Sequence, residues 1–558
     1  MKTNAPVVAI GLDSADPIIL ETWMNEGKLK NLAAIRDAGV YGRLNNKVNY
    51  LTAQGIKFSC TEPLWVMCLT GCLPNKTGFW DTVTYSHDYS VRCDAVYGGY
   101  DYGEYKPFYS LFVDHKVLAF DIPVSRVVDN VNGVQVTGWG GHHPFVASES
   151  QPADVLPSIV ERYGENPVFR KDNGSWWSQD YFNWVTTSVE QSLTTRTQIL
   201  SELMAKDDWD LFFTAFGETH TLGHDLLHLS QPQHPLYSAL NKQATLGDPM
   251  LKGFQQVDEA VGKLLQQVPE DAYVVVFSLH GMDVNNADLL SMMFIAEVMY
   301  RFNFPGKYGL TPGNIDEPPG PVILKNIRNG WAGEVWRQVY EPNPLKKLWN
   351  TWAPKRFLAD EHHGLKSPYS LYKDDLELGW MPAMSYSGLW PKMKAFAIPG
   401  FADGYVRINL KGRERDGIVD PAEYDSLCEE ITKVFYGLKD GRTGKALVQQ
   451  VIRTRLDPFS EARESPEADL IIVWDDLHTD VVDSPDVGRI GPITYNRSGG
   501  HRARGFMMVK GPGLDTEYGV TEGGAVDVGA TILSLLGEAV PAYFDGKPLV
   551  KVSIPSAV

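Results

Sequence analysis

The sequence predicts an α/β fold with a central sheet that is mostly parallel. Short apolar runs alternate with segments whose apolar residues recur at helical spacing over most of the chain. The chain has 558 residues, of which 43% are hydrophobic and 22% charged, so it can bury a large core. Strands of the same type resume after two irregular regions, which predicts a single domain over residues 1–558.

The elements follow from these patterns in order. Candidate central strands are the apolar runs Val7–Leu12, Val117–Phe120, Leu211–Ala215, Tyr273–Ser278, Leu470–Trp474 and Phe506–Val509. Amphipathic patterns predict helices at Ile19–Ala38, Ser188–Ala205, Met250–Gln267 and Val526–Leu536. The last helix is followed by Gly537, a residue suited to a helix C-terminus.

Two regions interrupt the alternation. Residues 86–184 are rich in Tyr, Trp and Gly, and residues 302–394 are rich in Pro, Trp and Lys. We expect both to be insertions that lie over the sheet, the first aromatic-rich and the second cap-like.

Charge and cysteine content predict where the protein works. The net charge is −18 and no long Lys/Arg run is present, so we expect neither a nucleic-acid partner nor an anionic membrane surface. No segment has the ~18 consecutive apolar residues of a membrane span, and the N-terminal apolar run is too short for a signal peptide. The five cysteines form no CxxC pair, which argues against disulfides and predicts a cytoplasmic protein.

Polar residues follow the predicted strands, where open parallel sheets bind ligands. Asp13 follows the first strand, His280 follows VVVFS, and His501 lies in RSGGHRARG. Glu218, His220 and His224 lie in GETHTLGH, after DLFFTAF, and Thr61 precedes an apolar helical pattern. Each residue alone has an ordinary interpretation as a turn, cap or surface residue. Together they indicate an active site.

These motifs carry a resemblance. AIGLDSADP, TEPLWVMCLTGCLPNKTG, AFGETHTLGH, VVVFSLHGM and GGHRARGFMMVKGPG, followed by VDVGATILSLLG, resemble the alkaline phosphatase superfamily and its type I phosphodiesterase/nucleotide pyrophosphatase family. The resemblance implies an alkaline phosphatase-like α/β sandwich, two metals and a Thr or Ser nucleophile. Thr61 matches the nucleophile and Asp13 a ligand of the second metal, while His224 and His501 match ligands of the first. His280 matches the histidine of the family's Asp-His-Gly motif.

Two positions depart from the family pattern, which has Asp where this chain has His220 and Leu279. A first site of His220, His224 and His501 with an open fourth position suits catalytic zinc. The second site loses a carboxylate at Leu279, so we expect one zinc and a weak, re-liganded or absent second metal. Glu218, Asp16 and Asp283 are candidate replacements. For Glu218, a solvated loop carboxylate is an equally good interpretation.

Activation of the threonine has two open routes. A metal would lower the pKa of the Thr61 hydroxyl; without one, His280 is the candidate general base. Thr61 is also suited to a helix N-terminus, where anionic groups are favoured. Arg502 and Arg504, like Arg497, are positioned to bind phosphate oxygens or to pair with surface acids.

The sequence therefore predicts a metal-dependent hydrolase of phosphate mono- or diesters that uses a threonine nucleophile. Its expected partner is a small-molecule phosphate ester or a related anion. Two alternatives remain open: a transferase or other non-hydrolytic enzyme that uses a one-metal site on an anionic small molecule, and a non-catalytic binding protein.

Overall fold

The computed structural model describes residues 5–93, 99–141, 147–171, 179–240, 247–316, 331–354, 357–373, 378–460 and 463–552. A central eight-stranded sheet has the order β2-β22-β11-β1-β10-β7-β8-β9. Its strands are β1 (Val7–Leu12), β2 (Val40–Asn45), β7 (Val117–Phe120), β8 (Gly133–Thr137), β9 (Glu149–Gln151), β10 (Leu211–Phe216), β11 (Tyr273–Ser278) and β22 (Arg504–Lys510). The strands from β11 to β8 are parallel, whereas β2, β22 and β9 pair antiparallel. This confirms the predicted α/β fold.

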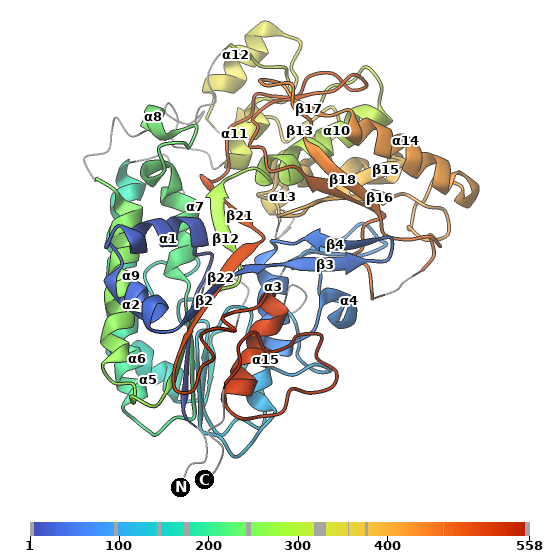
Figure 1. The fold of residues 1–558 in the computed structure, drawn as a ribbon. Helices are drawn as coiled ribbons and strands as arrows, with labels where there is room; N and C mark the ends of the chain where they lie inside the picture. Colours follow the sequence, from blue (N-terminus) through green and yellow to red (C-terminus); the bar gives the residue numbers. More distant parts are fainter. Residues whose placement is uncertain are drawn as a thin grey trace.

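Helices cover both faces of this sheet (Figure 1). One layer contains α2 (Lys30–Ala38), α6 (Gln179–Met204), α7 (Glu218–Ser230) and α9 (Pro249–Leu265), and the other contains α3 (Thr61–Thr70) and α15 (Ala525–Leu535). Strands β1, β10 and β11 are buried along their whole length, as expected for strands between two helical layers. The core therefore lies on both sides of the parallel strands, and their polar ends form one edge.

The segment predicted as a single helix at Ile19–Ala38 forms two helices. They are α1 (Pro17–Asn25) and α2, and Gly27 lies between them with a φ of 71°. This left-handed conformation ends a helix and costs glycine little. Asp16 caps α1, because its side chain accepts a hydrogen bond from the Ile18 N–H.

The run Leu470–Trp474 is a strand, β19, but it does not join the central sheet. It belongs to a second, antiparallel sheet with the order β15-β16-β19-β18. The other strands are β15 (Ala395–Ile398), β16 (Gly404–Ile408) and β18 (Val448–Arg453), and helices α10 (Ile295–Asn303) and α14 (Tyr424–Tyr436) lie beside them (Figure 1). Because β19 is buried on both faces, its apolar run resembles a central strand.

The two predicted insertions differ. Residues 86–184 supply β7, β8 and β9, so this region contributes to the central sheet and is more than a covering insertion. Residues 302–394 supply no strand to that sheet among the described residues. They form α11 (Trp331–Arg337), α12 (Pro344–Trp352), α13 (Pro368–Lys373), the β13 (Glu361–His362)–β14 (Leu365–Lys366) hairpin and the 3-10 segment Pro382–Lys392, beside the second sheet (Figure 1).

Smaller elements complete the fold. Two-stranded pairs are β3 (Lys47–Tyr50) with β4 (Ala53–Lys57), β5 (Thr84–Tyr85) with β6 (Val91–Arg92), β12 (Gly281–Val284) with β21 (Gly499–Arg502), and β17 (Lys439–Asp440) with β20 (Val482–Asp483). Short helices are α4 (Pro74–Thr77), α5 (Val155–Tyr163) and α8 (Tyr237–Leu240). Among the described residues, no helix has both the length and the apolar character needed to cross a membrane.

Candidate metal and phosphate site

The site residues meet at the carboxyl edge of the central sheet. Asp13 directly follows β1, and α7 directly after β10 carries His220 and His224. His280 lies between β11 and β12. The β12–β21 pair sets His501 opposite Met282, which brings the C-terminal part of the chain to the same edge.

His220, His224 and His501 form a compact group, here called the histidine cluster. Within the described part of the chain, it is the one group of three or more His, Cys, Asp or Glu side chains with ligand atoms within 4.8 Å of one another. The Nε2 atom of His224 lies 3.2 Å from that of His220 and 3.0 Å from that of His501. The Nε2 atoms of His501 and His220 are 3.0 Å apart.

This spacing fits a tetrahedral metal ion. Zinc at about 2.0–2.1 Å from each nitrogen sets neighbouring nitrogens about 3.3–3.4 Å apart. The tautomer of His224 also fits, since its Nδ1 lies 2.7 Å from the carbonyl oxygen of Gly499 and must donate a proton to it. The lone pair of His224 Nε2 therefore faces the cluster, as in histidines that bind metals.

The loop before His501 holds α7 in place. Ser498 donates to the carbonyl oxygen of His224 from its backbone N–H, at 3.0 Å, and from its hydroxyl, at 2.8 Å. His234 donates from Nε2 to the carbonyl oxygen of Ser498 at 3.0 Å. A Cβ atom at Gly499 would lie 2.3 Å from the Gly223 oxygen, so only glycine permits this approach.

Thr61 lies beside the cluster. Its hydroxyl oxygen is 3.2 Å from His501 Nδ1, and Thr61 is the first residue of α3, as the sequence predicts. A negative charge on the oxygen of Thr61 would therefore lie at the positive end of this helix.

Asp13 and His280 form the adjoining part of the site. Asp13 Oδ1 accepts a hydrogen bond from Trp65 Nε1 at 3.0 Å and lies 3.5 Å from His280 Nε2. Asp13 Oδ2 is buried and accepts no hydrogen bond from any described residue. A buried carboxylate oxygen in this state is suited to a cation. His280 also contacts the hydroxyl of Ser14, a residue with a φ of 58°.

Leu279 closes this side with an apolar side chain, and no described carboxylate takes the place of the missing ligand. Leu279 is buried, and its carbonyl oxygen accepts a hydrogen bond from Asn46. Asp16 and Asp283, two of the candidate replacements, both pair with Arg504 at 2.8 Å. We call Asp13, His280 and Leu279 the leucine corner.

Glu218 is held elsewhere. Its Oε1 accepts a hydrogen bond from Arg196 Nε at 2.9 Å and another from Ser192 on α6. Arg196 also pairs with Asp121 at 2.8 Å, and the charged side chains of this triad are fully buried. Glu218 is therefore neither a solvated loop carboxylate nor a member of the histidine cluster; its Oε1 is held by this triad, while its buried Oε2 accepts no hydrogen bond from a described residue.

Of the three arginines near His501, the one that reaches the cluster is Arg497. Arg502 pairs with Asp476 at 2.8 Å, and Arg504 pairs with Asp16 and Asp283. Arg497 Nη1 instead lies 3.0 Å from His224 Nε2. Its Nε and Nη2 atoms donate to Asp288 at 2.8 and 3.1 Å. All three arginines lie near His501 in the sequence, but in the structure each pairs with different residues.

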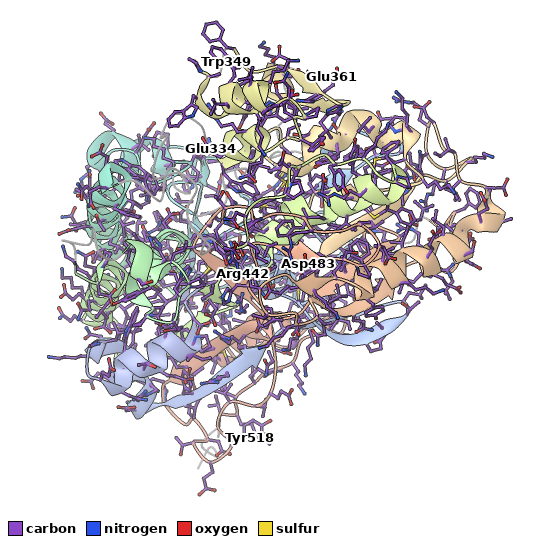
Figure 2. The ribbon with its side chains drawn as sticks, turned by 90° about the horizontal axis from the view of Figure 1, so that it is seen from above. Glu334, Trp349, Glu361, Arg442, Asp483 and Tyr518 are labelled. Atoms are coloured by element: carbon purple, nitrogen blue, oxygen red, sulfur yellow. The ribbon has the colours of Figure 1, made fainter. Side chains whose placement is uncertain are left out.

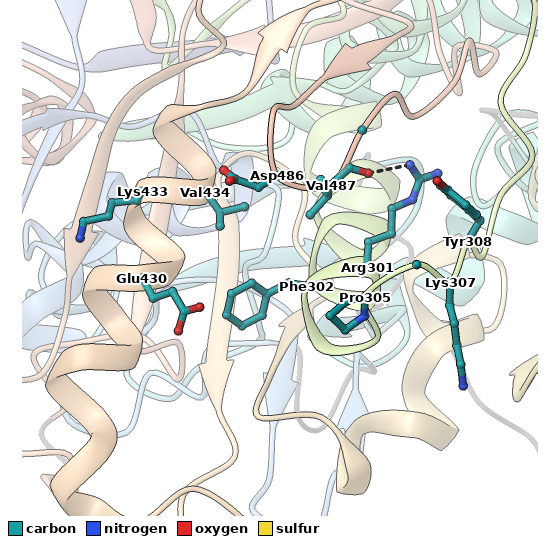
Figure 3. Close-up of a pocket in the computed structure, with 12 residues that line it drawn as sticks. Arg301, Phe302, Pro305, Lys307, Tyr308, Glu430, Lys433, Val434, Asp486 and Val487 are labelled. Atoms are coloured by element: carbon teal, nitrogen blue, oxygen red, sulfur yellow. Dashed lines mark hydrogen bonds between the residues drawn. The ribbon is translucent and has the colours of Figure 1, made fainter.

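A cavity of about 260 Å³ borders the site between the two sheets. Its lining includes His501, Arg502, Trp474, Asp403 and Lys57. A larger pocket of about 440 Å³ lies between α10 and α14 (Figure 3) and contains none of the predicted site residues. There Arg301 donates to the carbonyl oxygen of Val487 at 3.0 Å, so its guanidinium helps to hold the wall.

Comparison with known proteins gives the family. The family model of type I phosphodiesterase/nucleotide pyrophosphatase matches residues 7–300, more than half of the chain. Similar solved structures include phosphonoacetate hydrolase from Sinorhizobium meliloti 1021 in complex with phosphonoacetate (12% identity, 96% of each chain covered, TM-score 0.46). Human ectonucleotide pyrophosphatase/phosphodiesterase 5 is 11% identical, with 96% of each chain covered and a TM-score of 0.43. Curated protein sequences give no match. The chain belongs to the type I phosphodiesterase/nucleotide pyrophosphatase family and is a phosphodiesterase- or phosphatase-like enzyme.

Proposed function

We propose that the protein hydrolyses phosphate mono- or diesters of small molecules, with Thr61 as nucleophile and zinc in the histidine cluster. The observation that carries this proposal is the convergence of the three Nε2 atoms within 3.2 Å of one another, with His501 next to the Thr61 hydroxyl. The ligands would be His220, His224 and His501. Zinc bound there supplies positive charge for a phosphoryl oxygen and lowers the pKa of an oxygen that binds it.

Thr61 forms the new bond. Its oxygen attacks phosphorus while the bond to the leaving oxygen breaks, which gives a phosphothreonine; water then attacks the phosphothreonine and restores the hydroxyl. His501 Nδ1, 3.2 Å away, orients the hydroxyl oxygen of Thr61. The N-terminus of α3 favours the anionic groups that develop there.

His280 and Asp13 handle protons in this proposal. Asp13 lies 3.5 Å from His280 Nε2, and its carboxylate would stabilise an imidazolium. His280 is thus suited to accept the proton of Thr61 in the first step and pass it to the leaving oxygen, and then to accept a proton from the attacking water and return it to the oxygen of Thr61. Its ring centre is 4.7 Å from that of His501, which itself contacts Thr61.

Arg497 replaces Arg502 and Arg504 as the proposed phosphate-binding arginine. Two of its nitrogens are fixed on Asp288, and the remaining Nη1 lies 3.0 Å from His224 Nε2, a contact that zinc binding by this nitrogen would replace, leaving Nη1 to a phosphoryl oxygen. A guanidinium fixed in this way presents a charged donor to a phosphoryl oxygen with little loss of entropy. It also adds positive charge beside the histidine cluster.

Replacing Thr61 tests the nucleophile. Thr61→Ala should abolish turnover of bis(4-nitrophenyl) phosphate while zinc content, measured by mass spectrometry, stays the same. Thr61→Ser is the matched control, because it keeps the hydroxyl and should retain turnover and form a phosphoenzyme. If the alanine variant hydrolysed the ester at the wild-type rate, Thr61 would not be the nucleophile.

A further inference from the structure

Helix α12 exposes its apolar face to solvent. The apolar residues lie at positions i, i+3, i+4 and i+7, within an arc of about 100° on a helix. They are Leu345, Leu348, Trp349 and Trp352, and their exposed fractions are 76%, 60%, 55% and 63%. An amphipathic helix on a globular protein normally turns this face to the core.

Both ends of α12 are fixed by hydrogen bonds. Asn343 caps its N-terminus by accepting hydrogen bonds from the N–H groups of Leu345 and Lys346. Arg337 donates to the carbonyl oxygens of Asn350 and Ala353 and so fixes the C-terminus. The half-buried Asn350 faces inward, and Trp349 lies at the outer edge of the molecule (Figure 2). The ordered caps therefore hold the apolar face outward.

Helix α12 itself is positively charged, unlike the whole protein. It carries the exposed Lys346 and Lys347 and no acidic residue, although the chain has a net charge of −18. Such a segment is attracted to an anionic surface. A twofold contact between two copies would bring these cations together, which disfavours a second copy as the occupant.

We propose that α12 is a docking surface for an anionic lipid surface, into which Leu345, Leu348, Trp349 and Trp352 insert to the depth of the headgroups. Tryptophan and leucine beside lysine are the residues that interfacial helices use. The exposed apolar ridge projects from the protein, and lipid headgroups can adapt to a projecting ridge. The expectation of no membrane partner rested on the lack of spanning segments and of long basic runs, and the proposal departs from it at α12 alone.

Vesicle co-sedimentation tests the proposal. The full-length protein should bind vesicles of phosphatidylcholine with 30% phosphatidylserine, and bind much more weakly to phosphatidylcholine alone. Leu348→Glu with Trp349→Glu should weaken binding by roughly tenfold or more. Lys346→Gln with Lys347→Gln should weaken it by about fivefold for each lysine and reduce its salt dependence.

The matched control is Leu456→Glu, which changes a leucine of similar exposure, 64%, elsewhere on the surface and should leave vesicle binding unchanged. Unfolding temperatures and zinc content verify that every variant is folded. The proposal is overturned if the wild type binds neither kind of vesicle, or if the double glutamate variant binds like the wild type. It is also overturned if these substitutions abolish a dimer, or binding of an acidic peptide, while vesicles stay unbound.

Discussion

The histidine cluster and the leucine corner lie side by side but have opposite characters. The cluster gathers three imidazoles whose Nε2 atoms are within 3.2 Å of one another. The leucine corner keeps one carboxylate and one imidazole, and Leu279 is buried as part of the core. The cluster is carried by helix α7 and strand β21, whereas the leucine corner follows the ends of β1 and β11. The difference teaches that a leucine can stand where the family has a metal ligand without disturbing the elements that position the histidine cluster.

The largest expected effect comes from breaking the cluster. His224→Ala should release zinc and lower hydrolysis by more than about 100-fold, because two imidazoles hold the ion poorly. Zinc bound after dialysis and turnover of bis(4-nitrophenyl) phosphate are the measurements. His228→Ala, one turn further along α7, is the control and should keep its zinc. Equal zinc content in both variants would contradict the assignment of the cluster.

Restoring the carboxylate should come next in size. Leu279→Asp should raise bound metal from about one to about two ions per chain and increase hydrolysis, because the corner would regain a charged ligand. Leu279→Asn is the matched control, with the same shape and no charge. Both variants disturb the core, so the comparison rests on metal content in the folded fraction. A stoichiometry of one in both would show that more than this ligand is missing.

A moderate effect is expected at Arg497. Arg497→Lys cannot hold Asp288 and face the cluster together, so the KM for the diester and the inhibition constant for inorganic phosphate should rise about 10-fold. Zinc content should not change. Arg489, which pairs through two nitrogens with Asp483 at 2.6 and 2.7 Å, offers a matched arginine on the surface. If Arg489→Lys had the same effect, no special role for Arg497 would remain.

The last prediction concerns stability rather than activity, and it measures what an unpaired buried carboxylate costs in this protein. Burial, together with repulsion from Glu62, raises the pKa of Asp81 from 3.8 to about 7. Between these values the folded state keeps a proton that the unfolded state releases, so stability falls as the pH rises through this window. Asp81→Asn should therefore raise the unfolding temperature at pH 8, where the free energy of unfolding should increase by up to about 4 kcal/mol. At pH 4 the substitution should change both quantities little.

Thermal unfolding at both pH values measures this effect. Asp271→Asn, in an exposed turn, is the control and should shift neither curve. A flat difference between wild type and Asp81→Asn across the pH range would contradict the buried-charge explanation. The cost found at Asp81 also indicates what an aspartate at position 279 would cost without a second metal.

Local sequence patterns predicted much of the fold but little of which strands and side chains pair with one another. The apolar runs located β1, β7, β10 and β11, and the start of α3 at Thr61, because burial and helix initiation leave clear local signals. Assignment of β19 to the second sheet depends on tertiary pairing, which its composition does not encode. The same holds for side chains. The pairing of Glu218 with Arg196 and of Arg497 with Asp288 depends on tertiary contacts that the local sequence does not encode.

Strand β22 has a consequence for biosynthesis. It lies between β2 and β11, and the adjoining β21 carries His501, so the histidine cluster and the sheet both need a segment translated long after α7 and β11. A nascent chain that has released His220 and His224 from the ribosome still lacks His501 and leaves an edge of β11 open. On the proposed zinc assignment, zinc capture and sheet closure are linked events that follow the synthesis of β22, and a chain ending before residue 499 should neither hold zinc nor remain in solution.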